Sequence, residues 1–320
     1  MSFRVLKSAL GELEARGQRL VHDVIRGSLT GDSLIPEQYE EPKGDFGLFG
    51  PGSASWLVLD DLAALVGGIS SLYLQTLHPL AMAGVAEHSD YEHDPLGRLQ
   101  RTASFVRITT FGPTPDVDRV VRAVRKIHRG VVGTAPDGRL YAATDPDLAV
   151  WVHATEHMGY LKGAMVYHRN RRAITPQVAD RYLAEAARVG ELLGARNVPR
   201  SLAEMRAYFR RVRPELEYGE QARRAFGWLM DPPAGSPLQR AGYAVMKRGA
   251  LELLPRWGRE MLEVPEPSPL EVASTRAMVH SLLAVMRWGG AAEPSFKERA
   301  LARALARPDA SSTTSDRFHA

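Results

Sequence analysis

The sequence predicts an all-α protein. Helix-capping residues recur along the chain, and apolar residues recur at helical spacing between them. The chain has 320 residues, of which 44% are hydrophobic and 24% charged, so it is long enough to bury a substantial core. It contains no internal repeat and no long Pro/Ser linker. We therefore expect one helical domain over residues 1–308 and a disordered polar tail over residues 309–320.

The N-terminal part predicts a helix followed by a long ordered loop. Residues 3–29 have an amphipathic pattern, and residues 30–55 are rich in Gly, Pro and acidic side chains. We expect Ser55 to cap a helix that begins at Trp56.

Residues 66–86 carry no formal charge, and this uncharged run is long enough for a membrane span. The run contains Gln75 and His78-Pro79, and no aromatic belt flanks it. These features favour a buried core helix that is kinked or broken near His78-Pro79.

The next segments predict two helices and a short hairpin. Asp94-Pro95 opens a helix that Gly112-Pro113 ends, and Thr114 begins a second helix expected to run through His128 to Val132. A turn at 136–138 follows, and its flank at 139–142 is expected to form a hairpin arm. Further helices are predicted over 148–168, 175–191, 200–212, 217–229, 236–256, 268–288 and 293–306.

Composition excludes several classes of site. The chain has no cysteine, which rules out disulfides, iron–sulfur clusters and thiolate ligation of haem. The net charge is +4, but the arginines are spread among acidic residues, so we expect no nucleic-acid partner. The charges in the first twenty residues do not fit a signal peptide, and we expect a cytoplasmic protein.

Arg98, Arg101 and Thr102 stand at i, i+3 and i+4, so they share one side of a predicted helix. Arginine forks at this spacing suit carboxylates and phosphates, which indicates an anion clamp beside an apolar pocket. The alternative is a solvated helix face with ordinary ion pairs.

His128 lies on the apolar side of its predicted helix, near the helix end. Gly130 and Gly133 follow it and would let a bulky group approach closely. The alternative is a packed histidine whose ring is bonded to a backbone carbonyl.

Two further groups could carry chemistry. His153 and His157, with Glu156 between them, present two imidazoles on one helix face, either as metal ligands or as pocket lining, but no third ligand is evident. The loop pairs Glu87-His88 and His93-Asp94 could supply an acid or base at a pocket mouth, or be a solvated loop and a helix cap.

Taken in order, several motifs resemble a known family. They read LHPLAMAGVAEHS, DPLGRLQRT, IHRGVVG and YAATDPDLAVWVHAT. The string is similar to the superfamily that joins the bacterial latex clearing protein, a rubber oxygenase, with fungal oxygenases that cleave a farnesyl chain in mycophenolate biosynthesis. The resemblance covers residues 56–170 well and the C-terminal helices loosely.

The resemblance implies a globin-like helical fold around haem b, with additional helices at both ends. His128 matches the family's proximal iron ligand, and Arg98 and Thr102 match residues beside the haem, where Arg98 would suit a propionate. Arg101 stands where the latex clearing protein has a lysine able to cap the distal iron. Because arginine stays protonated, we expect an open or water-bound distal site.

No glutamate in the 78–86 helix matches a distal acid–base group. His78, Glu87 and His88 are the candidates, and His78 joins Arg101 and Thr102 in the expected catalytic set.

The expected function is O₂-dependent oxidation of a small apolar, isoprenoid-like or polyketide-like molecule by a haem b oxygenase, with cleavage of a carbon–carbon double bond as one form. A peroxidase-like use of the haem, a haem or ligand sensor without turnover, and a helical scaffold without cofactor stay open. We expect no integral membrane span. Peripheral membrane contact and a homodimer also stay open.

Overall fold

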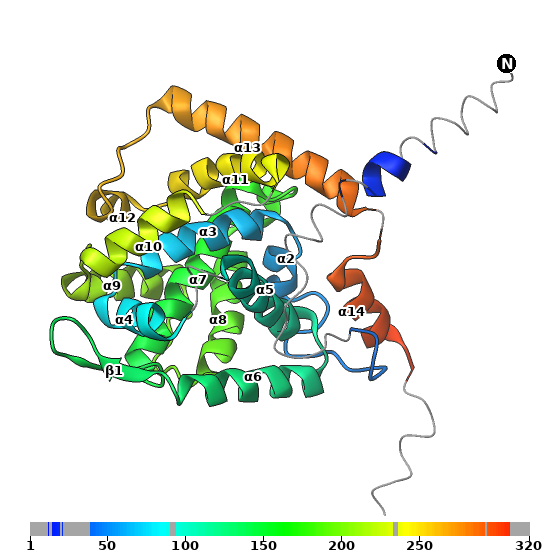
Figure 1. Cartoon of the computed structure of the whole chain (residues 1–320). Helices are drawn as coiled ribbons and strands as arrows, with labels where there is room; N and C mark the ends of the chain where they lie inside the picture. Colours follow the sequence, from blue (N-terminus) through cyan, green and yellow to red (C-terminus); the bar gives the residue numbers. More distant parts are fainter. Residues whose placement is uncertain are drawn as a thin grey trace, which may run out of the picture.

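The computed structural model describes residues 12, 15–19, 21, 39–89, 94–232, 236–291 and 293–307. The described part is all-α, as predicted, apart from one small hairpin (Figure 1). The α-helices are α2 (Ala54–Leu59), α3 (Ala63–Gln75), α4 (Pro79–His88), α5 (Pro95–Phe111), α6 (Thr114–His128), α7 (Pro146–Tyr167), α8 (Pro176–Leu192), α9 (Leu202–Val212), α10 (Glu220–Met230), α11 (Pro237–Glu252), α12 (Arg256–Met261), α13 (Pro269–Gly290) and α14 (Phe296–Leu305). The strands are β1 (Val132–Thr134) and β2 (Leu140–Ala142), and short 3-10 helices occur at η1 (Arg171–Ala173) and η2 (Arg213–Glu215).

Helices α3 and α7 cross at the centre of the molecule with their backbones in direct contact. A Cβ atom on Gly67 would lie 2.2 Å from the carbonyl oxygen of Gly159, and one on Gly163 would lie 2.5 Å from that of Ala63. Only glycine fits at such a crossing. Helices α11 and α13 lie along one side of this pair, and α6 lies on the opposite side of the molecule (Figure 1).

The apolar run at 66–86 is split into two helices, as predicted. Helix α3 ends at Gln75 and α4 begins at Pro79, after an extended His78 with φ −89° and ψ 111°. Proline disfavours the α conformation in the residue before it, which explains the break. Within the described ranges, no helix combines the length and apolar character needed to cross a bilayer.

The hairpin prediction is confirmed, but the predicted end of the preceding helix is wrong. Helix α6 stops at His128, and Val132 lies in β1. Gly133 pairs with Tyr141 in an antiparallel register. A glycine at 130 weakens helix propagation, and the β-branched residues after it are better satisfied by strand pairing.

Two other boundaries differ from prediction. The cap of α2 is Ser53, whose side chain accepts from the amide of Trp56, whereas Ser55 lies inside the helix and bonds to Glu185. The predicted 236–256 helix is two helices, α11 and α12, because Pro255 cannot continue α11.

Some predictions fall mostly outside the described residues. Of the predicted 3–29 helix, the described residues 12, 15–19 and 21 are helical. The 30–55 segment is described from residue 39 and is rich in turns up to the start of α2, while the 309–320 tail lies outside the described residues. The single-domain assignment stays a prediction.

Helix α5 is anchored at both ends. The Asp94 carboxylate accepts from the amide of Gly97 at 3.0 Å and caps its start, and the Trp56 indole donates to the carbonyl of Thr110 at 2.8 Å near its end. The backbone of α5 approaches α2, α6 and α14 closely, and α7 and α8 much less. The segment that carries Arg98 and Arg101 is thus attached to the molecule beside the central pair rather than packed tightly onto it.

Candidate functional site

His128 is the last residue of α6 and is half-buried. Burial lowers the pKa of its imidazole, so the neutral form dominates at pH 7. Among the described residues, no backbone or side-chain group hydrogen bonds to this ring. A neutral imidazole with an unshared lone pair is what a metal-ligating histidine requires, and this environment does not support the alternative of a carbonyl-bonded ring.

The end of α6 is held by contacts on both sides of His128. Arg125 donates to the carbonyl of Leu192 at the end of α8, at 3.5 Å, and Val131 packs against Tyr141 and Leu148. Gly133 does not leave room for a bulky group, because a Cβ there would lie 2.4 Å from the Tyr141 hydroxyl. This glycine serves the packing of the hairpin.

The arginine–threonine group occupies the first half of α5. Arg98 and Arg101 are half-buried and Thr102 is exposed. Arg101 forms an ion pair with Asp94 at 3.1 Å, and the Thr102 hydroxyl donates to the carbonyl of Arg98 at 3.1 Å. Arg101 is therefore held near the start of α5 by the residue that also caps this helix.

His78 lies elsewhere, at the start of α4. Its ring packs on Trp151 of α7, with 5.8 Å between ring centroids, and Nε2 lies 3.9 Å from Glu215 of η2. Its Nδ1 atom is buried and has no hydrogen-bond partner among the residues that the structure describes, and burial lowers the pKa of His78 to about 4. The described contacts join His78 to α7 and η2 rather than to Arg101 or Thr102, so its catalytic role stays a prediction.

Glu87 and His88, expected in a loop, are instead the last two residues of α4, and both bind the hairpin. The Tyr141 hydroxyl donates to Glu87 at 2.5 Å and lies 3.1 Å from Nε2 of His88. Burial and this carboxylate raise the pKa of Tyr141 to about 12. The cluster attaches β2 to the end of α4, while of the second loop pair, His93 lies outside the described residues and Asp94 is the α5 cap.

His153 and His157 pack between α7 and α8. Their ring centroids are 4.2 Å apart, and Nδ1 of His157 lies 2.8 Å from the Tyr182 hydroxyl. Nε2 of His153 is buried and finds no hydrogen-bond partner in the described ranges, and burial lowers the pKa of His153 to about 3. The described part of the chain holds no cluster of three metal-ligating side chains, so the pair resembles packed neutral imidazoles more than a metal site.

Glu156, named with the two histidines in the sequence, lies between them on α7. Its carboxyl group lies among many protein atoms, and this burial raises the pKa of the group. The residue as a whole is half-buried and keeps part of its accessible surface. The Tyr160 hydroxyl donates to its Oε1 at 2.8 Å.

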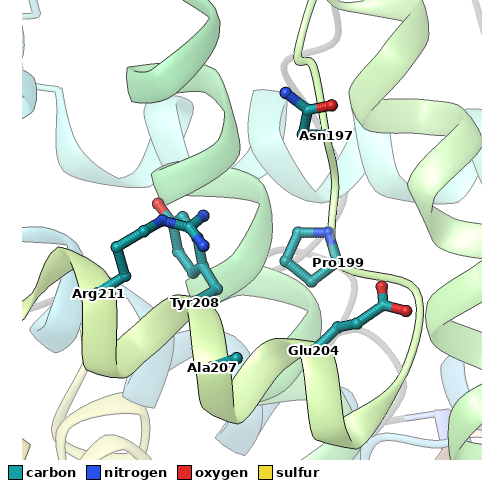
Figure 2. Close-up of a pocket in the computed structure, with 6 residues that line it drawn as sticks. All are labelled: Asn197, Pro199, Glu204, Ala207, Tyr208 and Arg211. Carbon is teal, nitrogen blue, oxygen red and sulfur yellow. The ribbon is translucent and has the colours of Figure 1, made fainter.

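A small surface pocket lies at α9, away from all of these residues in the sequence. Figure 2 shows its lining, with Arg211 beside Tyr208, and Pro199 and Glu204 across from them. The Arg211 guanidinium stands 5.4 Å from the Tyr208 ring centroid, and Glu204 accepts from the amide of Arg200. None of the predicted site residues lines this pocket.

Comparison with known proteins identifies the family. The model of the family described as "ER-bound oxygenase mpaB/B'/Rubber oxygenase, catalytic domain" matches residues 56–288. No curated protein and no solved structure matched the chain. The match covers well over half of the sequence and spans α3 to α13, including every candidate residue described above. The chain therefore belongs to the MpaB/rubber oxygenase catalytic-domain family.

Proposed function

We propose that this protein is a haem b-dependent oxygenase that holds the iron through His128. The supporting observation is the state of this imidazole, which is half-buried and neutral and has no hydrogen-bond partner among the described residues. Because the chain belongs to an oxygenase family, we interpret this neutral imidazole as an iron ligand. When bound, haem supplies an iron centre at which dioxygen is activated.

The residues present fit such a cofactor. Haem carries two propionates, and Arg98 is a half-buried guanidinium on the neighbouring helix that would pair with one of them. Thr102 lies one turn further along α5 and would offer a hydroxyl. The backbone of α5 approaches α7 and α8 less closely than it approaches α2, α6 and α14, and the cofactor would lie on this side of α5.

Arg101 would be a second cationic group beside the cofactor. Since a guanidinium does not lose its proton, it would donate hydrogen bonds to oxygen without ligating iron. Its ion pair with Asp94 would set its position. We therefore expect the distal iron position to be open or to hold water.

The substrate class rests on the family resemblance, and the apolar side chains of α5 agree with it. Phe105 and Val106 lie in the same helix as the arginines, and α7 presents Val152 as an exposed apolar side chain. These residues suit a small apolar molecule of the isoprenoid or polyketide type, whose double bond is the bond attacked. An intracellular location and a homodimer stay predictions.

An absorption spectrum tests the proposal. The protein purified from haem-supplemented cells should show a Soret band, and His128→Ala should lose it or shift it to that of weakly bound haem. His280→Ala is the matched control, because His280 lies on α13 with its ring against Tyr167 and should leave the band unchanged.

The outcomes separate the remaining alternatives. No Soret band in the wild type, or the same band in His128→Ala, would contradict the proposal and favour a scaffold without cofactor. A band that depends on His128, without oxygen uptake on isoprenoid or polyketide substrates, would favour a sensor.

A further inference from the structure

Helix α6 has an apolar inner side and a basic outer side. Val120 and Val121 are buried on the inner side, and α5 is the described element whose backbone approaches α6 closely. On the outer side, Arg122, Lys126 and Arg129 are exposed. Their spacing of i, i+4 and i+7 places these three cations along one line of the helix, facing solvent.

These positive charges are not neutralised within the described part of the chain. Arg122, Lys126 and Arg129 form no hydrogen bond or ion pair with any residue that the structure describes. Arg125 is exposed on the same side and donates to a backbone carbonyl, that of Leu192, which leaves its charge unpaired by an acid. The outer side of α6 is therefore available to an anionic partner.

The acidic residues near α6 offset little of this charge. Asp116 is buried and paired with Arg119, and Asp118 is the exposed acid of the helix. In the hairpin, Asp137 and Arg139 form an ion pair with each other at 2.6 Å.

The acids that follow the hairpin lie toward other elements. Asp145 influences the pKa of His78 at the start of α4, and Asp147 influences that of Tyr208 on α9. The outer side of α6 thus keeps an excess of positive charge.

The β1–β2 hairpin, which follows α6, has an apolar outer face. Gly133 pairs with Tyr141, whose ring is buried against α4, so the side chains of Val132 and Leu140 point to the opposite face. Val132 is 54% exposed and Leu140 is 79% exposed, and the register makes them diagonal neighbours across the two strands. Ile127, in the last turn of α6, is 51% exposed.

The basic side of α6 and the apolar face of the hairpin belong to one edge of the molecule (Figure 1). Residues 129–131 join the two elements directly. The inner side of α6 and the inner face of the hairpin both pack on the rest of the protein, so their outer sides both face away from it. Positive charge and exposed aliphatic side chains therefore meet on one surface.

We propose that this surface, formed by the outer side of α6 and the outer face of the β1–β2 hairpin, binds a lipid bilayer with anionic headgroups. The cations of α6 pair with headgroup phosphates and carboxylates. Val132 and Leu140 enter the boundary between the headgroups and the acyl chains. The inference goes beyond the proposed function and does not depend on haem.

Other partners suit this surface less well. A second copy of the chain, bound through the same surface, would bring the positive sides of two α6 helices together. Nucleic-acid surfaces combine basic side chains with aromatic ones on which bases stack, whereas Ile127, Val132 and Leu140 are aliphatic. Aliphatic side chains beside exposed cations are typical of a surface that lies in the membrane interface.

Co-sedimentation of the full-length protein with lipid vesicles tests the proposal. The protein should bind vesicles of phosphatidylcholine mixed with phosphatidylserine, and should bind vesicles of phosphatidylcholine alone much more weakly. Added salt should weaken the binding, because it screens the charges. Absence of binding to the anionic vesicles would overturn the proposal.

A pair of double variants tests the charges of α6. Arg122→Gln/Lys126→Gln should lower the affinity for the anionic vesicles about 30-fold. Arg206→Gln/Arg210→Gln is the matched control, because these arginines are also exposed and one helical turn apart, on α9. The control should bind as the wild type does. Equal losses in the two double variants would overturn the proposal, since binding would then follow net charge alone.

A second pair of variants tests the apolar part of the surface. Leu140→Ser should lower the affinity for the anionic vesicles about tenfold, because the leucine side chain no longer leaves water on binding. Leu270→Ser is the matched control, because Leu270 is 80% exposed at the start of α13. It should bind as the wild type does. All the substituted side chains except Lys126 and the arginines are leucines at the surface, and far-UV circular dichroism checks that each variant folds.

The remaining outcome identifies a different partner. If Leu140→Ser binds the vesicles as the wild type does, and duplex DNA competes with them, the surface binds polyanions and the bilayer proposal is overturned. Because vesicle binding needs no haem, it is measured independently of the Soret band. Loss of that band in His128→Ala and loss of vesicle binding in Arg122→Gln/Lys126→Gln are therefore separate results.

Discussion

The α3–α7 crossing and the α5–α6 segment differ in how tightly their helices pack. At the crossing, Gly67 and Gly159 bring two backbones into contact, and large buried side chains such as Tyr73 and Trp151 fill the space around them. The α5–α6 segment instead carries Arg101 and His128 half-buried, on helices that approach α7 much less closely.

The α3–α7 crossing therefore stabilises the fold, whereas the α5–α6 segment carries the candidate site residues. A close-packed backbone crossing has one arrangement and leaves no space for a ligand. A cofactor can reach half-buried polar groups on a loosely packed segment without displacing a close-packed core.

The largest expected effect is at Asp61, which anchors the rigid region. Asp61 is buried between α2 and α3 and accepts from Arg287 of α13 at 2.6 Å, while Arg287 also donates to the carbonyl of Tyr167. Asp61→Asn leaves a partly buried guanidinium without its anion. We expect the free energy of unfolding to fall by about 3 kcal/mol, measured by urea denaturation at pH 7.

The pH dependence of stability gives a check on the same pair. Burial alone would raise the pKa of Asp61, but the Arg287 and Ala63 hydrogen bonds and the Arg287 charge bring it below 3.8. The stabilisation is therefore present above about pH 4 and is lost as the pH falls through the folded-state pKa. Asp61→Asn should not show this loss of stability at low pH.

Glu260→Gln is the control, because it breaks an exposed ion pair. It should lower the free energy of unfolding by less than about 1 kcal/mol, and equal losses at the two sites would contradict the prediction.

The next effect in size is at the crossing itself. Gly67→Ala would place a Cβ atom 2.2 Å from a backbone oxygen, so α3 and α7 must move apart. We expect a loss of about 2–3 kcal/mol in the free energy of unfolding.

Gly227→Ala is the matched control, because Gly227 lies in α10 with open space around its missing Cβ atom. It should stabilise the protein by about 0.5–1 kcal/mol through helix propensity. Similar losses at both positions would show that α3 and α7 are not held by backbone contact.

Much of the fold was predictable because local chemistry determines where helices start. Pro79 and the Asp94-Pro95 pair produce the breaks and starts that their backbone restrictions require. The errors arose where two local signals competed. Gly130 and the following β-branched residues ended α6 early, and Pro255 divided a segment whose apolar pattern was continuous.

The site was predictable only in part. The motif order drew attention to Arg98 and His128, but sequence spacing says nothing about which helices lie side by side. The attachment of Glu87 to Tyr141 depends on how the hairpin folds back onto α4. The surroundings of Glu156 depend on how α3 and α8 pack against α7, which sequence spacing does not give.

The smallest effect concerns how firmly the looser region holds Arg101. Asp94 both caps α5 and pairs with Arg101, and the two side chains are 49% and 34% exposed. Asp94→Ala should cost about 1 kcal/mol, mostly from the lost cap, and Arg101→Ala less than about 0.5 kcal/mol. A double-mutant cycle measured by urea denaturation should give a coupling below about 1 kcal/mol. A coupling of that size leaves Arg101 able to exchange its carboxylate partner for a ligand. A coupling above about 2 kcal/mol would mean that the arginine is fixed in its ion pair, and the contrast between a rigid centre and an available α5 would no longer hold.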